Sequence, residues 1–175
     1  MAVNPKPLPE VVVRPAREED LDTIVDLYAA VAAEGRWIGT EVPFDRERRR
    51  QLLADALDEE RAMLLVADAG GRVVGELSMR LAGYGVADLA MLVADGWRGR
   101  GLGGALLQAG VDWARQAGAH KVALQVWPHN QAAIALYEKF GFQREGLLRR
   151  HYRRRSGDLW DAVVMGLLLD PDPAG

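Results

Sequence analysis

Apolar residues recur along the chain with two periods, and these periods separate helices from strands. Leu21, Ile24, Val25 and Tyr28 follow the spacing i, i+3, i+4, i+7, which is typical of one face of an amphipathic helix. Glycine is a frequent stop signal at the end of a helix, so we expect this helix to end near Gly35. The apolar face of this helix is predicted to lie against a core.

The other elements are predicted from the same periods and from their capping and turn residues. A second helix is expected after Asp45, a third over about 102–116 with Gly118 as its stop signal, and a short one between Asn130 and Gly141. Runs of β-branched and alternating apolar residues predict strands. These runs are 11–13, 63–68, 72–83, 88–95, 121–127, 143–155 and 159–169.

The order of these elements is typical of a mixed α/β domain. Strands alternate irregularly with helices, and no internal repeat or linker divides the 175 residues. A hydrophobic content of 49% is enough to bury a core of its own. We therefore expect one domain over 11–169, with flexible termini at 1–10 and 170–175.

Charge and cysteine content narrow the function classes. The net charge is only −3, which argues against a general nucleic-acid binder or a polybasic membrane-surface protein. Residues 1–95 carry 11 basic and 18 acidic side chains, net −7, whereas residues 96–175 carry 11 and 7, net +4. There is no cysteine, hence no thiol nucleophile, and no run of about 20 apolar residues that would suit a bilayer helix. A cytoplasmic protein is expected.

Glycines cluster at the junction between a predicted strand and a predicted helix. Five of them, at 96, 99, 101, 103 and 104, fall within nine positions. Without Cβ atoms the backbone can approach a ligand closely, and the free N–H groups at the helix start attract anions. Arg98 and Arg100 add positive charge, although Arg98 could instead anchor the loop. The pattern predicts a pyrophosphate-binding loop.

The same glycines leave two other interpretations open. Gly99, Gly101 and Gly104 match the GxGxxG fingerprint of NAD-dependent oxidoreductases. That fingerprint opens a first βαβ unit and expects an acidic residue about 20 positions later, but here it lies in mid-chain and 119–130 contains no acidic residue. A tight helix start that binds no ligand is the other alternative.

Two motifs in this region resemble those of the GNAT superfamily of acyl-CoA-dependent N-acyltransferases. The superfamily's phosphate loop, Gln/Arg-x-x-Gly-x-Gly/Ala, is similar to residues 98–103. Its second motif is similar to residues 130–142, which include Asn130, Tyr137, Lys139, Gly141 and Phe142. The ending, 145–161, resembles branches that acetylate protein N-termini (ribosomal-protein alanine) or phosphinothricin-type amino acids.

This resemblance covers about 11–169 and implies a single-domain GNAT-like fold, in which helices flank a central mixed, mostly antiparallel, twisted sheet. It implies acetyl-CoA as co-substrate, no metal, the Val93 N–H as polariser of the thioester carbonyl, and Tyr137 as general acid. The implied cofactor-binding residues are Met91, Leu92, Val93, Arg98, Gly99, Arg100, Gly101, Leu102, Gly103, Gly104, Asn130 and Tyr137. The plainer alternatives are a core aromatic role for Tyr137 and a helix cap for Asn130.

The general base is where the sequence departs from the family pattern. The ribosomal-protein alanine branch has a glutamate before the second motif, where this chain has Gln125. An amide cannot accept the proton, so Glu41 is our first candidate, Glu76 the second, and Asp88 a third. Each of them could instead be a solvated carboxylate.

Other conspicuous residues carry less information. The run 149–155 (RRHYRRR) is interpreted as a solvated hairpin, near the CoA phosphates or a dimer contact, because alternation in a strand sends its arginines to both faces. The three histidines lack metal-ligand spacing. Trp37 and Trp160 fit an acceptor pocket or a core equally well.

The predicted function is direct transfer of the acetyl group of acetyl-CoA to a primary amine, in an amino-acid-like molecule or a protein N-terminus, through a ternary complex. The basic half would bind the polyanionic co-substrate, and the acidic half would supply walls suited to a cationic amine. Alternatives are a catalytically silent acyl-CoA-binding regulatory domain and the NAD-dependent oxidoreductase. No nucleic-acid or membrane partner is expected, and a homodimer is left open.

Overall fold

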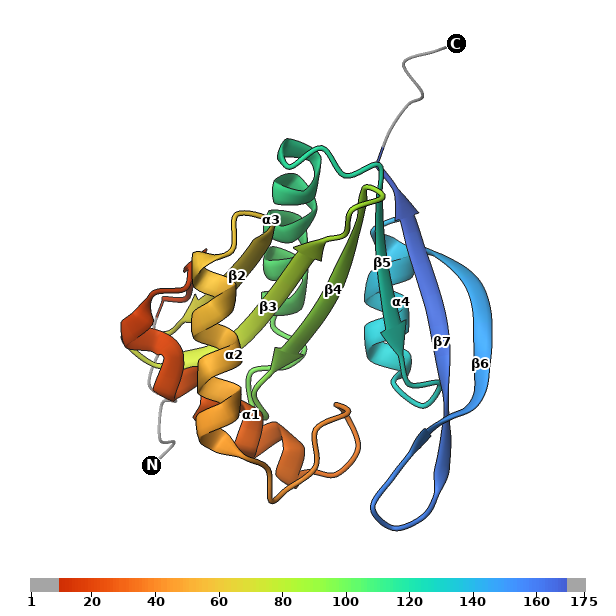
Figure 1. Cartoon of the computed structure of the whole chain (residues 1–175), viewed down its shortest axis with the longest axis horizontal. Helices are drawn as coiled ribbons and strands as arrows, with labels where there is room; N and C mark the ends of the chain where they lie inside the picture. The colour runs from red at the N-terminus through yellow and green to blue at the C-terminus, as the bar shows by residue number, and fades with distance from the viewer. Residues whose placement is uncertain (1–9, 170–175) are drawn as a thin grey trace, which may run out of the picture.

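A computed structural model describes residues 10–169 of the chain, and the predicted flexible termini lie outside these residues except for Glu10. The described elements follow the predicted order (Figure 1). They are β1 (Val12–Pro15), the 3-10 turn η1 (Glu18–Asp20), α1 (Leu21–Ala33), α2 (Arg46–Asp58), β2 (Ala62–Asp68), β3 (Val73–Leu81), β4 (Val86–Val93), α3 (Leu102–Gln116), β5 (Lys121–Val126), α4 (Gln131–Lys139), β6 (Gln143–Arg153) and β7 (Leu159–Leu168).

Two predicted helix caps are confirmed by their hydrogen bonds. The Asp45 carboxylate accepts a bond from the Arg48 N–H at 2.9 Å at the start of α2. The Asn130 side chain accepts one from the Ala133 N–H at 3.2 Å at the start of α4. Each bond satisfies a donor that the helix itself leaves free, so the local sequence determines where both helices begin.

Most strand bounds differ from the prediction by one or two residues, and two of these differences have a clear physical reason. β1 runs on through Pro15, which an edge strand tolerates because only one side of it forms a ladder. β6 ends at Arg153 instead of Arg155, and its register with β7 shifts between Leu148 and Tyr152, where Arg150 has a φ of +52°. A bulge of this kind bends a strand and redirects the side chains that follow.

The seven strands form one mixed, mostly antiparallel sheet in the order β1-β2-β3-β4-β5-β7-β6, as the fold class predicted. β4 and β5 form the one parallel pair among the described strands, and they pair only over 86–88 and 121–123. Beyond that point β4 stays paired with β3 up to Val93, and β5 stays paired with β7 up to Val126. The two central strands therefore diverge, which leaves a gap within the sheet (Figure 1).

Helices cover both faces of the sheet. α1 lies on one face, where its Tyr28 donates a hydrogen bond to Glu76 of β3. α3 lies on the other face, where a Cβ at Gly110 would meet the side chains of Leu77 and Met79 of β3. Successive side chains of a strand point to opposite faces, so even-numbered residues of β3 face α1 and odd-numbered ones face α3. The gap between β4 and β5 therefore opens toward both helix-covered faces of the sheet.

Candidate active site

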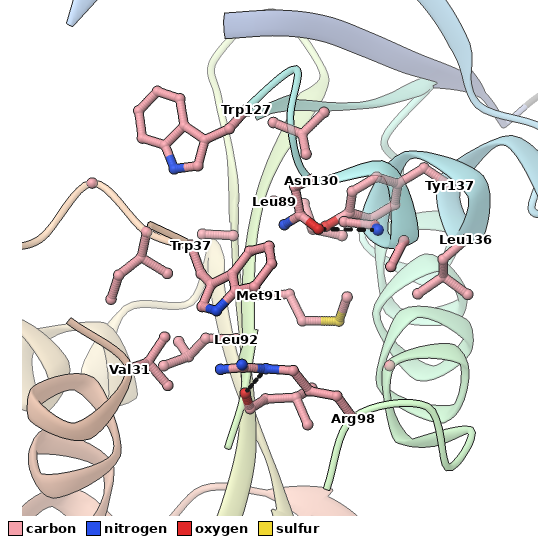
Figure 2. Close-up of a pocket in the computed structure, with 18 of the residues that line it drawn as sticks. Val31, Trp37, Leu89, Met91, Leu92, Arg98, Trp127, Asn130, Leu136 and Tyr137 are labelled. Carbon is pink, nitrogen blue, oxygen red and sulfur yellow. Dashed lines mark hydrogen bonds between the residues drawn. The ribbon is translucent and has the colours of Figure 1, made fainter. Parts of the chain in front are cut away.

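A cavity of about 770 Å³ lies where β4 and β5 diverge. Its wall is formed by the loop after α1, the ends of β4 and β5, the start of α3, and α4. Figure 2 shows Trp37, Met91, Arg98, Trp127 and Tyr137 approaching this space from these different elements. Segments far apart in the sequence therefore meet around one volume.

The edge of β4 that borders the cavity carries backbone groups without a strand partner. The Ala94 N–H bonds the Val74 carbonyl in β3, so the peptide groups of even-numbered β4 residues point toward β3. The His120 N–H bonds the Gly85 carbonyl, so odd-numbered residues point toward β5. Beyond residue 88, where β5 has moved away, the peptide groups of Met91 and Val93 face the gap. The peptide groups of Leu92 instead face β3, and Leu92 also lines the cavity.

The glycine-rich loop leads into the N-terminus of α3 at the cavity wall. Gly101, the N-cap residue, has a φ of +84°, a conformation that a residue with a Cβ adopts only with strain. A Cβ at Gly103 would lie 3.0 Å from the Leu136 side chain of α4, so α3 and α4 approach closely here. Gly99 and Gly104 also line the cavity. The free N–H groups of the first turn of α3 therefore lie at its rim.

The two arginines of this loop have different surroundings. Arg98 donates from Nε to the Val93 carbonyl at 2.9 Å (Figure 2) and from both terminal nitrogens to Glu34, at 2.6 and 2.7 Å. This ion pair lowers the pKa of Glu34. Arg100 is exposed, with its guanidinium 5.7 Å from the Trp97 ring centroid. Arg98 thus anchors the loop, which was the alternative role considered for it.

Of two further predicted residues of this region, one lines the cavity and the other packs in the core. Leu102, the first residue of α3, packs against the core and does not line the cavity. Asn130 caps α4 and also lines the cavity, so its two interpretations are compatible.

Tyr137 follows Asn130 by seven residues, about two turns of α4, and both residues line the cavity (Figure 2). Its side chain is 6% exposed and its ring packs against Phe142, with centroids 5.6 Å apart. Burial raises the pKa of Tyr137 to about 12. The hydroxyl forms no hydrogen bond to any residue that the structure describes. A neutral phenol with a free O–H therefore borders the cavity.

The acidic candidates are not equivalent. Glu41 does not line the cavity: it pairs with Arg154 at 3.5 Å and accepts a bond from the Arg155 N–H at 3.1 Å. Asp88 is exposed on β4, before the strands diverge. Gln125 lines the cavity, and its oxygen accepts a bond from the Tyr152 hydroxyl at 2.6 Å.

Glu76 is fully buried beneath the cavity-lining Tyr28. One carboxyl oxygen accepts a bond from the Tyr28 hydroxyl at 3.2 Å, and the other has no hydrogen-bond partner among the described residues. Burial raises the pKa of Glu76 from its ordinary 4.5 to about 8. Buried polar atoms rarely stay unpaired, so a buried carboxyl with one unpaired oxygen next to the cavity is an unusual feature.

The basic run is not wholly a solvated hairpin. Arg154 is 5% exposed, its guanidinium lies 4.4 Å from the Trp160 ring centroid, and it donates to the Gly39 carbonyl at 3.1 Å. Arg154 therefore holds the loop between α1 and α2 in place. Trp160 packs behind Trp127, with centroids 5.4 Å apart, whereas Trp37 lines the cavity, so the two tryptophans left undecided have different roles.

The expectation of acidic acceptor walls is wrong. Among the described residues that line the cavity, Arg49 and Arg98 are charged and none is aspartate or glutamate. Many carboxylates of the first half instead pair with arginines, as Asp22 does with Arg50 and Asp20 does with Arg14. Folding thus pairs many acidic residues with arginines and does not gather them at the site.

Sequence reasoning missed many residues of the cavity wall, among them four with aromatic or charged side chains. Tyr28 was placed in the apolar stripe of α1 and taken as core. Arg49, Trp127 and Tyr152 also line the cavity. Arg49 precedes Leu53 by one helical turn, so a charged residue in line with an apolar face was the signal that could have found it.

Residues 10–169 contain neither a cluster of metal ligands nor a membrane-spanning helix. No group of three or more histidine, aspartate or glutamate side chains in this range could hold a metal ion. Nor does any helix in this range have the length and apolar character needed to cross a membrane.

Known proteins share this architecture. A model described as the acetyltransferase (GNAT) family matches residues 24–142. An L-methionine sulfoximine/L-methionine sulfone acetyltransferase from Pseudomonas aeruginosa is 30% identical over 164 residues, which cover 91% of this chain and 95% of that protein. A phosphinothricin N-acetyltransferase from Streptomyces coelicolor is 29% identical over 168 residues, with 88% and 94% covered. The crystal structure of a ribosomal-protein-alanine N-acetyltransferase from Brucella melitensis has a TM-score of 0.80 at 30% identity and covers 90% of this chain and 99% of that one.

Proposed function

Given that the chain belongs to the GNAT family of acetyltransferases, we propose that it transfers the acetyl group of acetyl-CoA to the amino group of a small amino-acid-like molecule. It is an acetyl-CoA-dependent N-acetyltransferase. The family membership confirms the resemblance in residues 98–103 and 130–142 and replaces the oxidoreductase alternative. The acceptor, the site residues and a cytoplasmic location are proposals.

One observation carries the proposal. The free edge of β4, the start of α3 and the hydroxyl-bearing Tyr137 of α4 border a single cavity. An extended chain can pair with a free strand edge, and a pyrophosphate suits a helix N-terminus. A cavity of about 770 Å³ with an extended wall and an anion-binding end fits acetyl-CoA.

The residues that would hold acetyl-CoA divide by chemistry. Met91 offers its peptide N–H and C=O groups to the pantetheine arm, and Val93 offers its N–H, because the Val93 carbonyl already accepts from Arg98. The loop and helix start, residues 99–104, offer backbone N–H groups to the pyrophosphate, with Arg100 exposed nearby as a cation. Leu92 and Asn130 contribute side-chain contacts. Arg98 and Leu102 act indirectly, because Arg98 fixes the loop to Val93 and Leu102 fixes the helix to the core.

Acetyl-CoA supplies an activated thioester, and the chain supplies polarisation and proton transfer. The Val93 N–H points into the gap and would stabilise negative charge on the thioester oxygen. The amine nitrogen forms a bond to the carbonyl carbon as the carbon–sulfur bond breaks. Tyr137 then donates its proton to the departing sulfur, and its raised pKa keeps it protonated until that step.

The amine must lose a proton in the same reaction, and we propose Glu76 as the base that takes it. Its carboxyl is bonded to the Tyr28 hydroxyl, and Tyr28 lines the cavity, so the proton would pass through that hydroxyl. A base with a pKa of about 8 suits an amine better than an ordinary carboxylate does. Glu41, which is engaged with Arg154 outside the cavity, would hold the loop instead.

The acceptor class follows from the cavity wall and from a relative. The relative from Pseudomonas aeruginosa is named for acetylation of L-methionine sulfoximine and L-methionine sulfone. Trp37, Trp127 and Tyr152 provide aromatic surface in the cavity, which would suit contact with the side chain of such an amino acid.

The test measures thiol release from acetyl-CoA across a panel of L-amino acids, polyamines and peptides, with the acetylated product identified by mass spectrometry. We expect turnover with amino acids and a thermal shift with CoA alone. Failure to bind CoA would overturn the proposal. CoA binding without turnover on any amine would instead support the silent acyl-CoA-binding domain.

A further inference from the structure

Arg49 of α2 extends into the cavity from the face of the sheet covered by α1 and α2. Its guanidinium lies 4.5 Å from the centroid of the Tyr28 ring, and one terminal nitrogen donates to the Thr40 hydroxyl at 2.9 Å. Both contacts are with uncharged groups. The side chain is therefore held in place while its charge remains available.

No carboxylate among residues 10–169 forms an ion pair with Arg49. Arg98, the other charged residue of the cavity wall, is already paired with Glu34. Glu76 is bonded to the Tyr28 hydroxyl and forms no ion pair with Arg49, although the Arg49 charge slightly offsets the rise that burial causes in the pKa of Glu76. Arg49 is thus a cavity-lining guanidinium that no described carboxylate pairs with directly.

The phosphates of CoA are not the partner that this charge suits. The phosphate-binding loop leads into α3, which covers the opposite face of the sheet. Arg49 lies on the α1 side, together with Tyr28 and with Thr40 of the loop between α1 and α2. Arg49 therefore belongs to a different part of the cavity wall from the start of α3, and we assign it to the acceptor.

We propose that Arg49 binds the carboxylate of the acceptor and selects amines that carry a carboxylate beside the amino group. A guanidinium has five N–H donors in a plane, and Thr40 uses one of them, so enough remain for a two-point contact with a carboxylate. The acceptor side chain would then face Trp37, Trp127 and Tyr152. This inference rests on the proposed acetyl transfer to amino acids.

The test compares Arg49→Met with the wild type on matched pairs of acceptors, each L-amino acid against its own primary amide. The amide keeps the amino group and side chain but has no negative charge. We expect the wild type to prefer the acid, and Arg49→Met to lower kcat/KM for acids by about 10- to 100-fold with little change for amides. Arg48→Met, an exposed neighbour outside the cavity, is the matched control and should behave as wild type.

The outcomes separate this inference from the proposed function. Wild-type turnover of amides as fast as acids, or a preference for acids that survives in Arg49→Met, would overturn the role of Arg49 and leave acetyl transfer intact. Absence of turnover with every wild-type acceptor would overturn the proposed function itself. A thermal shift with CoA that is equal in wild type and Arg49→Met shows that the variant is folded and that the co-substrate site is unaffected.

Discussion

At the scale of single residues, the site depends on two hydroxyl groups in opposite situations. The Tyr137 hydroxyl borders the cavity with no described hydrogen-bond partner, whereas the Tyr28 hydroxyl is bonded to the buried Glu76. Burial raises the pKa of both phenols, so neither ionises at neutral pH. Tyr137 can therefore donate a proton, and Tyr28 can pass one on.

Tyr137→Phe should lower kcat by about 100-fold, because general acid catalysis contributes on that order. The ring packing against Phe142 stays, so the fold and the affinity for CoA should not change. Initial rates and CoA thermal shifts measure the two effects. Tyr84→Phe, at a 74% exposed tyrosine outside the cavity, is the control. Unchanged kcat in Tyr137→Phe would remove the residue from this role.

Glu76 predicts a pH dependence of activity. The carboxylate form is the proton acceptor, and its pKa is about 8, so kcat/KM should rise with pH through about 8. In Glu76→Gln this rise should be replaced by the titration of the acceptor amine alone. A pH–rate profile of both enzymes decides this, with Glu47→Gln, an exposed glutamate of α2, as control. Identical profiles would exclude Glu76 as the base.

The same group predicts a pH dependence of stability. The folded-state pKa is raised above the ordinary 4.5, so the protonated carboxyl is the favoured form in the fold. Its contribution is fully present below pH 4.5 and is lost as pH rises through about 8. The Tm of the wild type relative to Glu76→Gln should therefore fall between pH 5.5 and 8.5. A difference in Tm that stays constant would contradict the raised pKa.

The residues of the site were only partly predictable from the sequence. Glycines 99, 101, 103 and 104, Asn130 and Tyr137 lie where their motifs indicated, because a motif reflects contacts that are local in the chain. The roles of Arg49 and Tyr28 in the site could not be predicted from the sequence, because their partners, Thr40 and Glu76, come from other elements. Side-chain pairing across elements does not follow from a period.

At the scale of elements, the loop between α1 and α2 is held in place by the turn between β6 and β7. Arg154 donates to the carbonyls of Ile38 and Gly39, and the Arg155 side chain donates to the Pro43 carbonyl at 2.6 Å. This turn explains why the loop can present Trp37 and Thr40 to the cavity without regular structure of its own.

Arg154→Met should loosen that loop. Removing the guanidinium leaves loop carbonyls without their donor, which costs about 1–3 kcal/mol and lowers Tm by about 5 °C. The KM for the acceptor should rise by about tenfold because the loop borders its site. CoA affinity should not change. Thermal melts and kinetics on Arg154→Met and on the exposed control Arg153→Met test this, and an equal KM in both would contradict it.

The elements themselves were largely predictable, and the exceptions are tertiary. Periodicity and the caps Asp45 and Asn130 are local signals, and the helices begin where these signals indicate. The bulge of β6 around Arg150 was not foreseen, because it depends on the register with β7 and on the bond from the Arg150 N–H to Asp161 at 2.6 Å. That bulge precedes Tyr152, whose hydroxyl reaches Gln125 in β5.

At the scale of the whole molecule, ion pairs join the two charge-biased halves of the chain around the cavity where β4 and β5 diverge. The net −7 of residues 1–95 does not produce an acidic cleft, because Glu34 pairs with Arg98 and Glu41 with Arg154 of the other half. These pairs bridge the halves on either side of the cavity. The electrostatic asymmetry therefore stabilises the assembly of the site, and Arg49 determines the charge that the acceptor meets.

The most direct measurement is the structure of the protein in complex with CoA and an amino-acid acceptor. We predict that the pantetheine arm pairs with the peptide groups of Met91 and Val93, that the pyrophosphate lies at the N-terminus of α3, and that the sulfur lies within hydrogen-bond reach of the Tyr137 hydroxyl. The acceptor carboxylate should contact Arg49. CoA bound outside the gap between β4 and β5, or with its sulfur directed away from Tyr137, would contradict the account.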